Sequence, residues 1–421
     1  MRADRELQSP LNRTSDRTAV ALCCVGMQIG LSWAEGGTDE ADVPGDGRGR
    51  VGRRGLFERG TMMAGIGSAA MRIWRSRWTR RIGSALLFFW FAYWTWQVIG
   101  DTFSAWPYHL DVIGVDGRLY YRAAGMWVSG GDPWTAYTAT NTWPPGPQWI
   151  HFLFTGPPPT VLAFVPFVWI PESIFVIAWL GLTAAAAVYA LRRLHLPVWW
   201  ILFPPLAQGI LVGNPHVVCL ALLLSGSRWL QALAAPMKAY AVVPMIGERQ
   251  WRALGLLIVG LAISLVIFWP LWAQYFKEYS TVQDWLIGAT HWNPDRTLYV
   301  AAAVALGALA LIDRRAASWL AVAALWPGGQ FFYLSFILPA APVLAPLLTF
   351  NGWRPVPIVP SAIADHALGM NNLFQIIVAY ALARLVLRIL GYAHRRQVLG
   401  RACRALRTRS VLQAPRLPPR D

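Results

Sequence analysis

From residue 82 onward, long apolar segments alternate with short polar ones. About 20 apolar residues are enough for a helix to cross the hydrocarbon core of a bilayer. Several segments reach that length, and others are shorter and interrupted by proline. The pattern predicts an all-α polytopic membrane bundle with about 10–12 spans. The candidate segments are residues 82–100, 156–170, 173–191, 197–212, 217–227, 229–246, 253–272, 297–312, 316–324, 331–350 and 373–390.

Arginine clusters stand at the ends of several apolar segments, and the positive-inside bias places such ends in the cytoplasm. The number of segments between successive clusters is not always even. Some proline-broken segments are therefore expected to be half-helices or re-entrant, which is tolerated where the backbone is buried in protein or lines a cavity. The last segment, 373–390, is the weakest candidate because it contains Arg384 and Arg388. The clusters lie at residues 80, 192, 249, 314 and 395.

Only 14% of the residues are charged, well below the roughly 25% of an ordinary soluble domain. A net charge of +16 would suggest nucleic-acid binding in a soluble protein. Here the arginines lie mainly at segment ends and in the tail, where contact with anionic lipids favours them. We therefore expect membrane lipids, and no nucleic acid, as partners. The four cysteines, Cys23, Cys24, Cys219 and Cys403, have neither metal-site nor disulfide-framework spacing, so we expect no metal and no cofactor.

Three regions follow from these patterns. Residues 1–70 are polar and rich in Gly and Arg, and we expect a disordered or wrongly assigned leader, with translation starting at Met62 or Met63. Residues 71–394 form the membrane domain, in which 101–156 is an outer catalytic loop and 274–296 a second outer loop. Residues 395–421 form a basic cytoplasmic tail.

The loop of residues 111–147 combines acidic side chains with many aromatic ones. An ionised side chain costs about 2.5–3.5 kcal/mol at the bilayer centre on insertion scales, so Asp111, Asp116 and Asp132 are expected at or outside the interface. Trp and Tyr favour the same depth. A carboxylate-bearing loop at the membrane surface suggests a site that acts on amphiphilic substrates.

The same loop contains a recognisable pattern. Residues 115–134 read VDGRLYYRAAGMWVSGGDPW, followed by WPP at 143–145, GNPH at 213–216 and APMKAYAVVP at 235–244. In this order the motifs resemble the polytopic glycosyltransferases of the GT-C superfamily, and in particular glycosyltransferase family 87, the polyprenyl-phosphate-mannose-dependent mannosyltransferases. The resemblance covers about residues 78–279. One departure is GNPH, which stands where the family has Gly-Gln-x-Asn.

The resemblance implies a GT-C-like fold and an inverting enzyme at the outer face of a bacterial inner membrane. The enzyme would move a hexose, in the first place mannose, from a polyprenyl-phosphate donor to a glycolipid or polysaccharide acceptor. Asp116 matches the catalytic aspartate and would act as general base. The anionic leaving group needs cations or donors where its charge develops. The candidates for phosphate binding are Lys238, Arg118, Arg122 and His216, and those for substrate binding are Tyr120, Tyr121, Asn214 and His291.

Several assignments have a structural alternative. Asp116 could cap the helix that follows it or form hydrogen bonds within the loop, and Lys238 could extend to the membrane interface. Asp132 before Pro133 is typical of a turn.

The whole chain has alternatives as well. A lipid or solute transporter would carry ionisable residues deep in its spans, and an acyl- or phospho-transferase would show a His-rich or acidic metal cluster. The third alternative is a non-catalytic scaffold of an envelope-polysaccharide assembly.

Overall fold

The computed structural model of the chain describes residues 77–104, 113–134, 153–289, 295–326, 331–349 and 371–392. This part of the chain consists of α-helices and short 3-10 helices joined by turns, without a strand. The prediction of an all-α fold is confirmed for it. The expected leader, 1–70, and tail, 395–421, lie outside the described residues.

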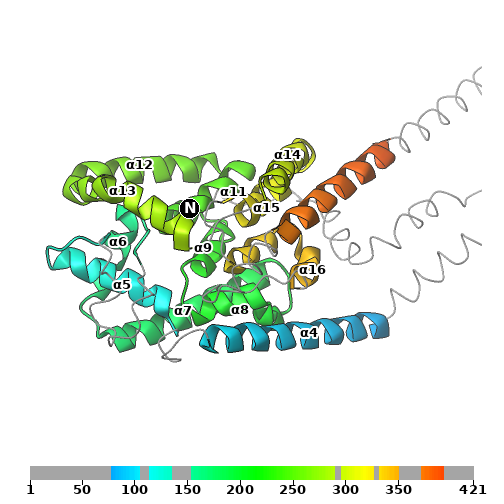
Figure 1. The fold of residues 1–421 in the computed structure, drawn as a ribbon, viewed down its shortest axis with the longest axis horizontal. Coiled ribbons are helices and arrows are strands. Elements are labelled where there is room, and N and C mark those ends of the chain that lie inside the picture. Colours follow the sequence, from blue (N-terminus) through cyan, green and yellow to red (C-terminus); the bar gives the residue numbers. More distant parts are fainter. Residues whose placement is uncertain are drawn as a thin grey trace, which may run out of the picture.

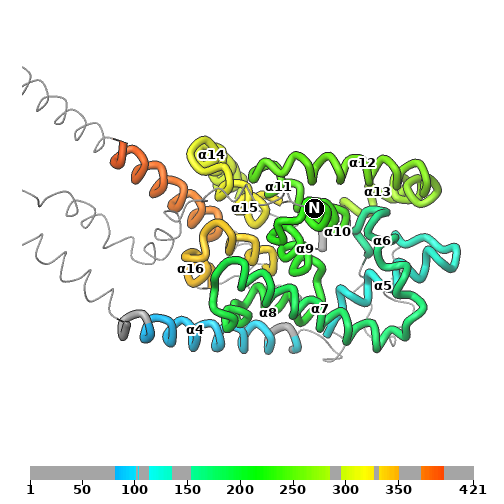
Figure 2. Tube along the Cα trace, turned by 180° about the vertical axis from the view of Figure 1, so that it is seen from behind, coloured from blue at the N-terminus to red at the C-terminus, as the bar shows by residue number. Residues whose placement is uncertain are grey.

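The helices follow one another closely and form a single helical assembly (Figures 1 and 2). α4 lies along one edge, α12 and α13 lie along the opposite edge, and α5 and α6 gather at one end. In chain order they are α4 (Arg77–Ser104), α5 (Val115–Val128), α6 (Pro158–Phe164), η3 (Val165–Phe167), α7 (Glu172–Arg193), η4 (Val198–Leu202), α8 (Pro204–Leu211), α9 (His216–Leu223), α10 (Arg228–Met237), η5 (Ala239–Ala241), α11 (Val242–Gly247), α12 (Trp251–Ile267), α13 (Trp269–Ala289), α14 (Arg296–Ile312), α15 (Arg314–Leu325), η6 (Phe331–Ile337), η7 (Pro342–Leu344) and α16 (Ala345–Thr349). A C-terminal helix, Asn371–Tyr392, follows.

Among the described residues, three helices are long and apolar enough to cross a membrane: Arg81–Gly100 within α4, Glu172–Arg193 and Asn371–Tyr392. Two bent pairs, α8 with α9 at 117° and α12 with α13 at 99°, raise the number to five if each pair is one span. The described residues thus hold fewer spans than the 10–12 predicted from apolar segments. Several of those segments are short helices packed inside the protein, as in α9, where all but one of the residues are buried.

Two further expectations need correction. The apolar run 253–272 is broken at Phe268, where α12 ends and α13 begins. The expected outer loop 274–296 is helical as far as Ala289, because it forms most of α13.

The C-terminal helix is span-length although it contains two arginines. Arg384 forms an ion pair with Asp313 at 2.7 Å, and Arg388 donates to the carbonyl of Ile312 at 3.0 Å. At the opposite end, the amide of Asp295 donates to Asn371 Oδ1 at 3.2 Å. The C-terminal helix therefore runs parallel to α14, and its arginines have partners at the α14–α15 corner.

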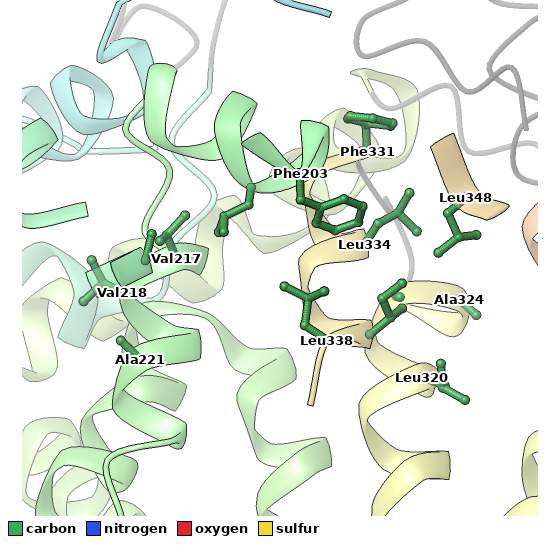
Figure 3. Packing of buried hydrophobic residues seen from close by; sticks show 14 of the residues in the cluster. Phe203, Val217, Val218, Ala221, Leu320, Ala324, Phe331, Leu334, Leu338 and Leu348 are labelled. Atoms are coloured by element: carbon green, nitrogen blue, oxygen red, sulfur yellow. The ribbon is translucent and has the colours of Figure 1, made fainter. Parts of the chain in front are cut away.

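The centre of the core lies where α8, α9, α15 and η6 meet. Figure 3 shows Phe203 beside Leu334. The same cluster includes Val217 on α9 and Leu320 on α15, and all four are fully buried. Burying such a side chain contributes about 1.5–3 kcal/mol. This packing fixes the short helices α8 and α9 on either side of the turn that separates them.

Hydrogen bonds of Glu248, which follows α11, connect α11 to α15. Its Oε1 accepts hydrogen bonds from Arg315 Nε at 3.0 Å and from Trp319 Nε1 at 2.8 Å. Its Oε2 accepts one from Gln250 Nε2 at 2.9 Å. We call this group of four residues the Glu248 junction.

Candidate active site

The N-terminus of α5 docks onto the break between α8 and α9. The amides of Gly114 and Asp116 donate to the carbonyls of Leu211 and Val212, at 2.8 and 2.9 Å. The first amides and the last carbonyls of a helix lack partners within that helix. Amides at the start of α5 thus bond to carbonyls at the end of α8. This pairing places Asp116 at the break between α8 and α9.

Gly213 makes this close approach possible. It adopts φ +67°, a left-handed conformation that glycine reaches without steric cost. A Cβ atom at this position would lie 3.2 Å from Trp179 Cδ1 and 3.3 Å from Gly114 Cα. Trp179 Nε1 also donates to the carbonyl of Gly213 at 2.7 Å. α7 therefore holds the turn in place from the side.

Asp116 and Asn214 meet at this turn. Asn214 is buried, and its Nδ2 donates to Asp116 Oδ2 at 2.6 Å. Its Oδ1 accepts from the backbone amide of His216 at 3.0 Å. Asp116 does not cap α5, because Gly114 occupies the N-cap position. The capping alternative for Asp116 is therefore wrong.

Lys238 reaches the same place from a second helix break. α10 ends at Met237, and Lys238 is extended, with φ −149° and ψ 109°, before the chain continues as η5 and α11. Its Nζ lies 5.6 Å from the centre of the Tyr120 ring, a cation–π arrangement. Tyr120 follows Asp116 by four residues, so the two share one face of α5. Lys238 thus lies over the face of α5 that carries the carboxylate.

Burial raises the pKa of the Asp116 carboxyl above its usual value. The positive charge of Lys238 and the hydrogen bond from Asn214 act in the opposite direction, and burial outweighs them. A carboxyl whose pKa lies above its usual value is a stronger base once it has lost its proton, and such shifts are common at functional sites.

Aromatic rings surround the deeper side of this cluster. The His216 ring stacks on Phe332 with ring centres 4.8 Å apart, and Tyr240 lies 4.8 Å from Tyr333. Both ring nitrogens of His216 and the hydroxyl of Tyr240 are buried and have no hydrogen-bond partner among the described residues. We call Asp116, Tyr120, Asn214, His216, Lys238 and Tyr240 the Asp116 cluster.

No protein-family model, curated protein or solved structure matches the chain. The interpretation of the Asp116 cluster therefore rests on its own geometry.

The structure does not bring all predicted site residues together. Arg122 makes two hydrogen bonds to Glu172, at 2.8 and 3.2 Å, and Arg118 Nε lies 3.8 Å from the same carboxylate. The Tyr121 hydroxyl donates to the carbonyl of Ile170 at 2.8 Å. These three residues lie on the face of α5 that packs on the start of α7, away from Lys238. Their predicted roles in phosphate and substrate binding are not supported by this arrangement.

Two other predictions have simple outcomes. Asp132 is a turn residue, as expected, because its Oδ1 accepts from the amide of Trp134 at 2.9 Å. His291 lies outside the described residues.

The sequence patterns missed three residues that shape the site. Trp179 and Tyr333 carry no motif, and Tyr240 lies inside the segment 235–244 but was not singled out. Among the described residues, no three His, Cys, Asp or Glu side chains come together as a metal site would require. Metal independence remains a prediction.

Proposed function

We propose that the chain is a multi-pass membrane glycosyltransferase of GT-C type, similar to family 87. It moves a hexose, in the first place mannose, from a polyprenyl phosphate to a glycolipid or polysaccharide acceptor. The observation that carries the proposal is the convergence of Asp116, Asn214 and Lys238 from three separate segments. Each stands in one of the motifs on which the resemblance rests.

In this proposal Asp116 is the general base. Asn214 holds its Oδ2, while Oδ1 accepts no hydrogen bond from the described residues and can take a proton. As the acceptor hydroxyl gives its proton to Oδ1, its oxygen bonds to the anomeric carbon. The bond from that carbon to the phosphate oxygen breaks, and the electron pair leaves with the polyprenyl phosphate. A base in this position contributes typically about 10²–10⁴-fold.

Lys238 is the residue best placed to stabilise the leaving phosphate. It is partly buried and makes no ion pair with any described residue, so its charge is available to an anionic ligand. Cations placed where charge develops are a large part of such catalysis. His216 and Tyr240 add buried polar atoms with free hydrogen-bonding capacity, which is uncommon in protein interiors unless a ligand or water meets it.

The location proposed for this reaction is the outer face of a bacterial inner membrane. α7 begins at Glu172 and ends at Arg192 and Arg193. The positive-inside bias assigns the arginine end to the cytoplasm. Trp179, which contacts the turn at Gly213, belongs to the first half of α7, so the cluster lies closer to the outer end.

A transporter is the second candidate, and one observation favours it. Helix breaks that meet inside a membrane bundle are typical of substrate sites in secondary transporters, and both α8–α9 and α10–α11 are broken at the Asp116 cluster. A transporter would move its substrate without breaking a glycosidic bond, so product analysis separates the two functions.

The test is sugar transfer from labelled polyprenyl-phosphate mannose in membranes that contain the protein. Asp116→Asn keeps the size of the side chain but removes the base, and we expect transfer to fall at least about 100-fold. Asp295→Asn is the matched control. The Asp295 side chain caps α14 by accepting from the amide of Leu298 at 2.9 Å, and asparagine caps equally well.

Three outcomes separate the possibilities. Loss of transfer in Asp116→Asn with normal transfer in Asp295→Asn supports the proposal. Full activity of Asp116→Asn contradicts the role of the carboxylate. If the wild-type protein transfers no hexose from any polyprenyl-phosphate donor but moves a sugar or lipid across proteoliposome membranes, the enzyme proposal is wrong and the transporter is supported.

A further inference from the structure

α13 turns away from α12 almost at a right angle. α12 is a 17-residue helix, about 25 Å long, and it begins next to the Glu248 junction. Apolar side chains cover its outer side, and Ile258, Val259 and Val266 are all more than half exposed. These features suit a helix that crosses most of a bilayer. α13 leaves its far end at 99°, so a membrane-crossing α12 places α13 nearly parallel to the membrane plane.

Hydrogen bonds among four residues hold this bend. The amides of Leu271 and Trp272 donate to the carbonyl of Phe268 at 3.0 and 3.2 Å. Trp272 Nε1 reaches back to Ser264 Oγ on α12 at 3.2 Å. The direction of α13 is thus fixed by local hydrogen bonds.

The residues of α13 fall on three separate faces, because each residue turns the helix by about 100°. One face packs on the protein and includes the buried residues Leu271 and Val282. A second face is aromatic, and a third is polar. The aromatic face consists of Trp269, Trp272, Phe276 and Tyr279, with Gln283 among them, and the polar face of Lys277, Ser280, Thr281 and Asp284.

Both outer faces are accessible. Phe276 and Tyr279 are exposed by 54% and 50%, and the Lys277 side chain by 77%. Large aromatic side chains left open to this extent suit contact with lipid more than contact with water. Lys277, Glu278 and Asp284 within the same helix would be costly at the bilayer centre.

We propose that α13 lies in the headgroup region of the membrane, with its aromatic face against the acyl chains and its polar face in water. Tyr and Trp favour this depth, and helices with separated polar and apolar faces bind in this way. The partner is the lipid surface itself. The proposal goes beyond the proposed function and does not depend on it, because a transporter with this fold would hold α13 at the same depth.

This position brings the lipid surface close to the Asp116 cluster. Tyr275 on α13 contacts Trp134 with ring centres 5.2 Å apart, and Trp134 lies 6.2 Å from Phe154. Phe154 in turn contacts Tyr120 at 5.2 Å. A continuous row of aromatic rings therefore leads from the interfacial helix to the ring under Lys238.

The test measures the depth of each face by spin labelling in liposomes. Single cysteines are placed at exposed positions of α13 in a protein whose four cysteines are replaced by alanine. Collisions with oxygen and with a water-soluble nickel chelate then report the depth of each label. Phe276, Tyr279 and Gln283 sample the aromatic side, and Lys277 and Asp284 sample the polar side. The same labels at Ile258, Ile263 and Val266 on α12 serve as the control.

We expect the accessibility along α13 to alternate with a period of about 3.6 residues and to show no change of mean depth from residue 276 to residue 284. The α12 labels, in contrast, should change depth steadily along the helix. A steady change along α13 would overturn the proposal, since it would make α13 part of a span. High nickel accessibility at every α13 position would also overturn it, because the helix would then lie in water.

Discussion

Two carboxylates of this protein, Glu248 and Asp116, both hold a junction between helices, but they differ in how completely they are satisfied. Glu248 accepts three hydrogen bonds from side chains, and one of its donors is the charged Arg315. Asp116 accepts one side-chain hydrogen bond, from Asn214, and the nearby Lys238 makes no ion pair within the described chain. A saturated carboxylate serves structure. A carboxylate with an open oxygen beside an available cation has capacity left for a ligand.

The contrast extends to the backbone. At the Glu248 junction α11 continues into α12 through a short turn that holds Gln250, and the other two donors, Arg315 and Trp319, come from a continuous helix, α15. At the Asp116 cluster two helices are interrupted, at Gly213 and at Lys238. Interrupted helices at membrane depth occur where backbone lines a site or is buried in protein. The two regions therefore predict opposite responses to mutation: loss of activity at one and loss of stability at the other.

Apart from the loss of Asp116 itself, the largest expected effect is that of Lys238→Met. Removing a cation that stabilises developing charge costs typically about 10²–10³ in kcat, and we expect transfer to fall by that factor without a loss of protein from the membrane. The measurement is the initial rate of sugar transfer at equal protein level. Arg122→Gln is the matched control, because Arg122 pairs with Glu172 on the other face of α5. If Arg122→Gln reduces transfer as much as Lys238→Met does, the distinction between the two faces fails.

Asn214→Ala should have the next largest effect. Asn214 positions the carboxylate through one hydrogen bond to a charged group, worth about 1.5–3 kcal/mol, so we expect kcat to fall about 10- to 100-fold with little change in KM. Steady-state kinetics with the donor varied measures the two parameters separately. An increase in KM with unchanged kcat would mean that Asn214 binds substrate and does not position the base.

Glu248→Gln should weaken the fold and spare the reaction. Glutamine keeps an acceptor for Trp319 but loses the charge that strengthens the hydrogen bond from Arg315, a loss of about 1–2 kcal/mol. We expect a lower thermal midpoint in detergent and near-normal transfer at low temperature. An unchanged midpoint would show that the junction contributes little to stability.

The smallest expected effects are changes in how the rate of transfer depends on pH. Because burial raises the pKa of Asp116, transfer should increase as the pH rises through that pKa, where the base loses its proton. Lys238→Met should move this acid limb to higher pH, since the lysine charge lowers the pKa of Asp116. A pH–rate profile of both proteins provides the test. Identical acid limbs would show that Asp116 does not control the rate.

The stability of the protein should also depend on the protonation of Asp116, but it should fall with rising pH where transfer increases. A carboxyl whose pKa is higher in the folded than in the unfolded chain adds most stability below the unfolded pKa. That contribution is lost as the pH rises through the folded pKa. At neutral pH, Asp116→Asn should therefore raise the stability, which melting curves at acidic and neutral pH can detect. A large loss of stability in this variant would indicate a structural carboxylate.

Much of this organisation could be predicted from the sequence, and the failures have physical causes. The motif residues Asp116, Asn214 and Lys238 were identified from their order, and the fold brings them together. Arg118 lies two positions after Asp116, and Arg122 two positions after Tyr120, so helical periodicity turns both arginines about 200° away from the face that carries the carboxylate. Their roles in phosphate binding stay predictions. Glu172, which takes up both arginines, gave no signal of its own.

In the described residues, fewer helices could cross a membrane than the sequence predicted. Hydropathy measures how apolar a segment is, and a half-helix buried in protein is as apolar as one in lipid. α9 is buried against its neighbours, and α8 meets it at 117°, so two apolar segments that suggested two spans are one bent pair. Proline at residue 215 and glycine at residue 213 marked the break without fixing its angle.

The most direct measurement compares Asp116→Asn with Glu248→Gln in one assay of transfer from polyprenyl-phosphate mannose, with the thermal midpoint of each protein recorded in parallel. Both changes remove one carboxylate charge and conserve the size of the side chain. We predict that Asp116→Asn lowers transfer at least about 100-fold and keeps or raises the midpoint, whereas Glu248→Gln keeps transfer and lowers the midpoint. Normal transfer by Asp116→Asn at a normal midpoint would contradict the assignment of this carboxylate as the base.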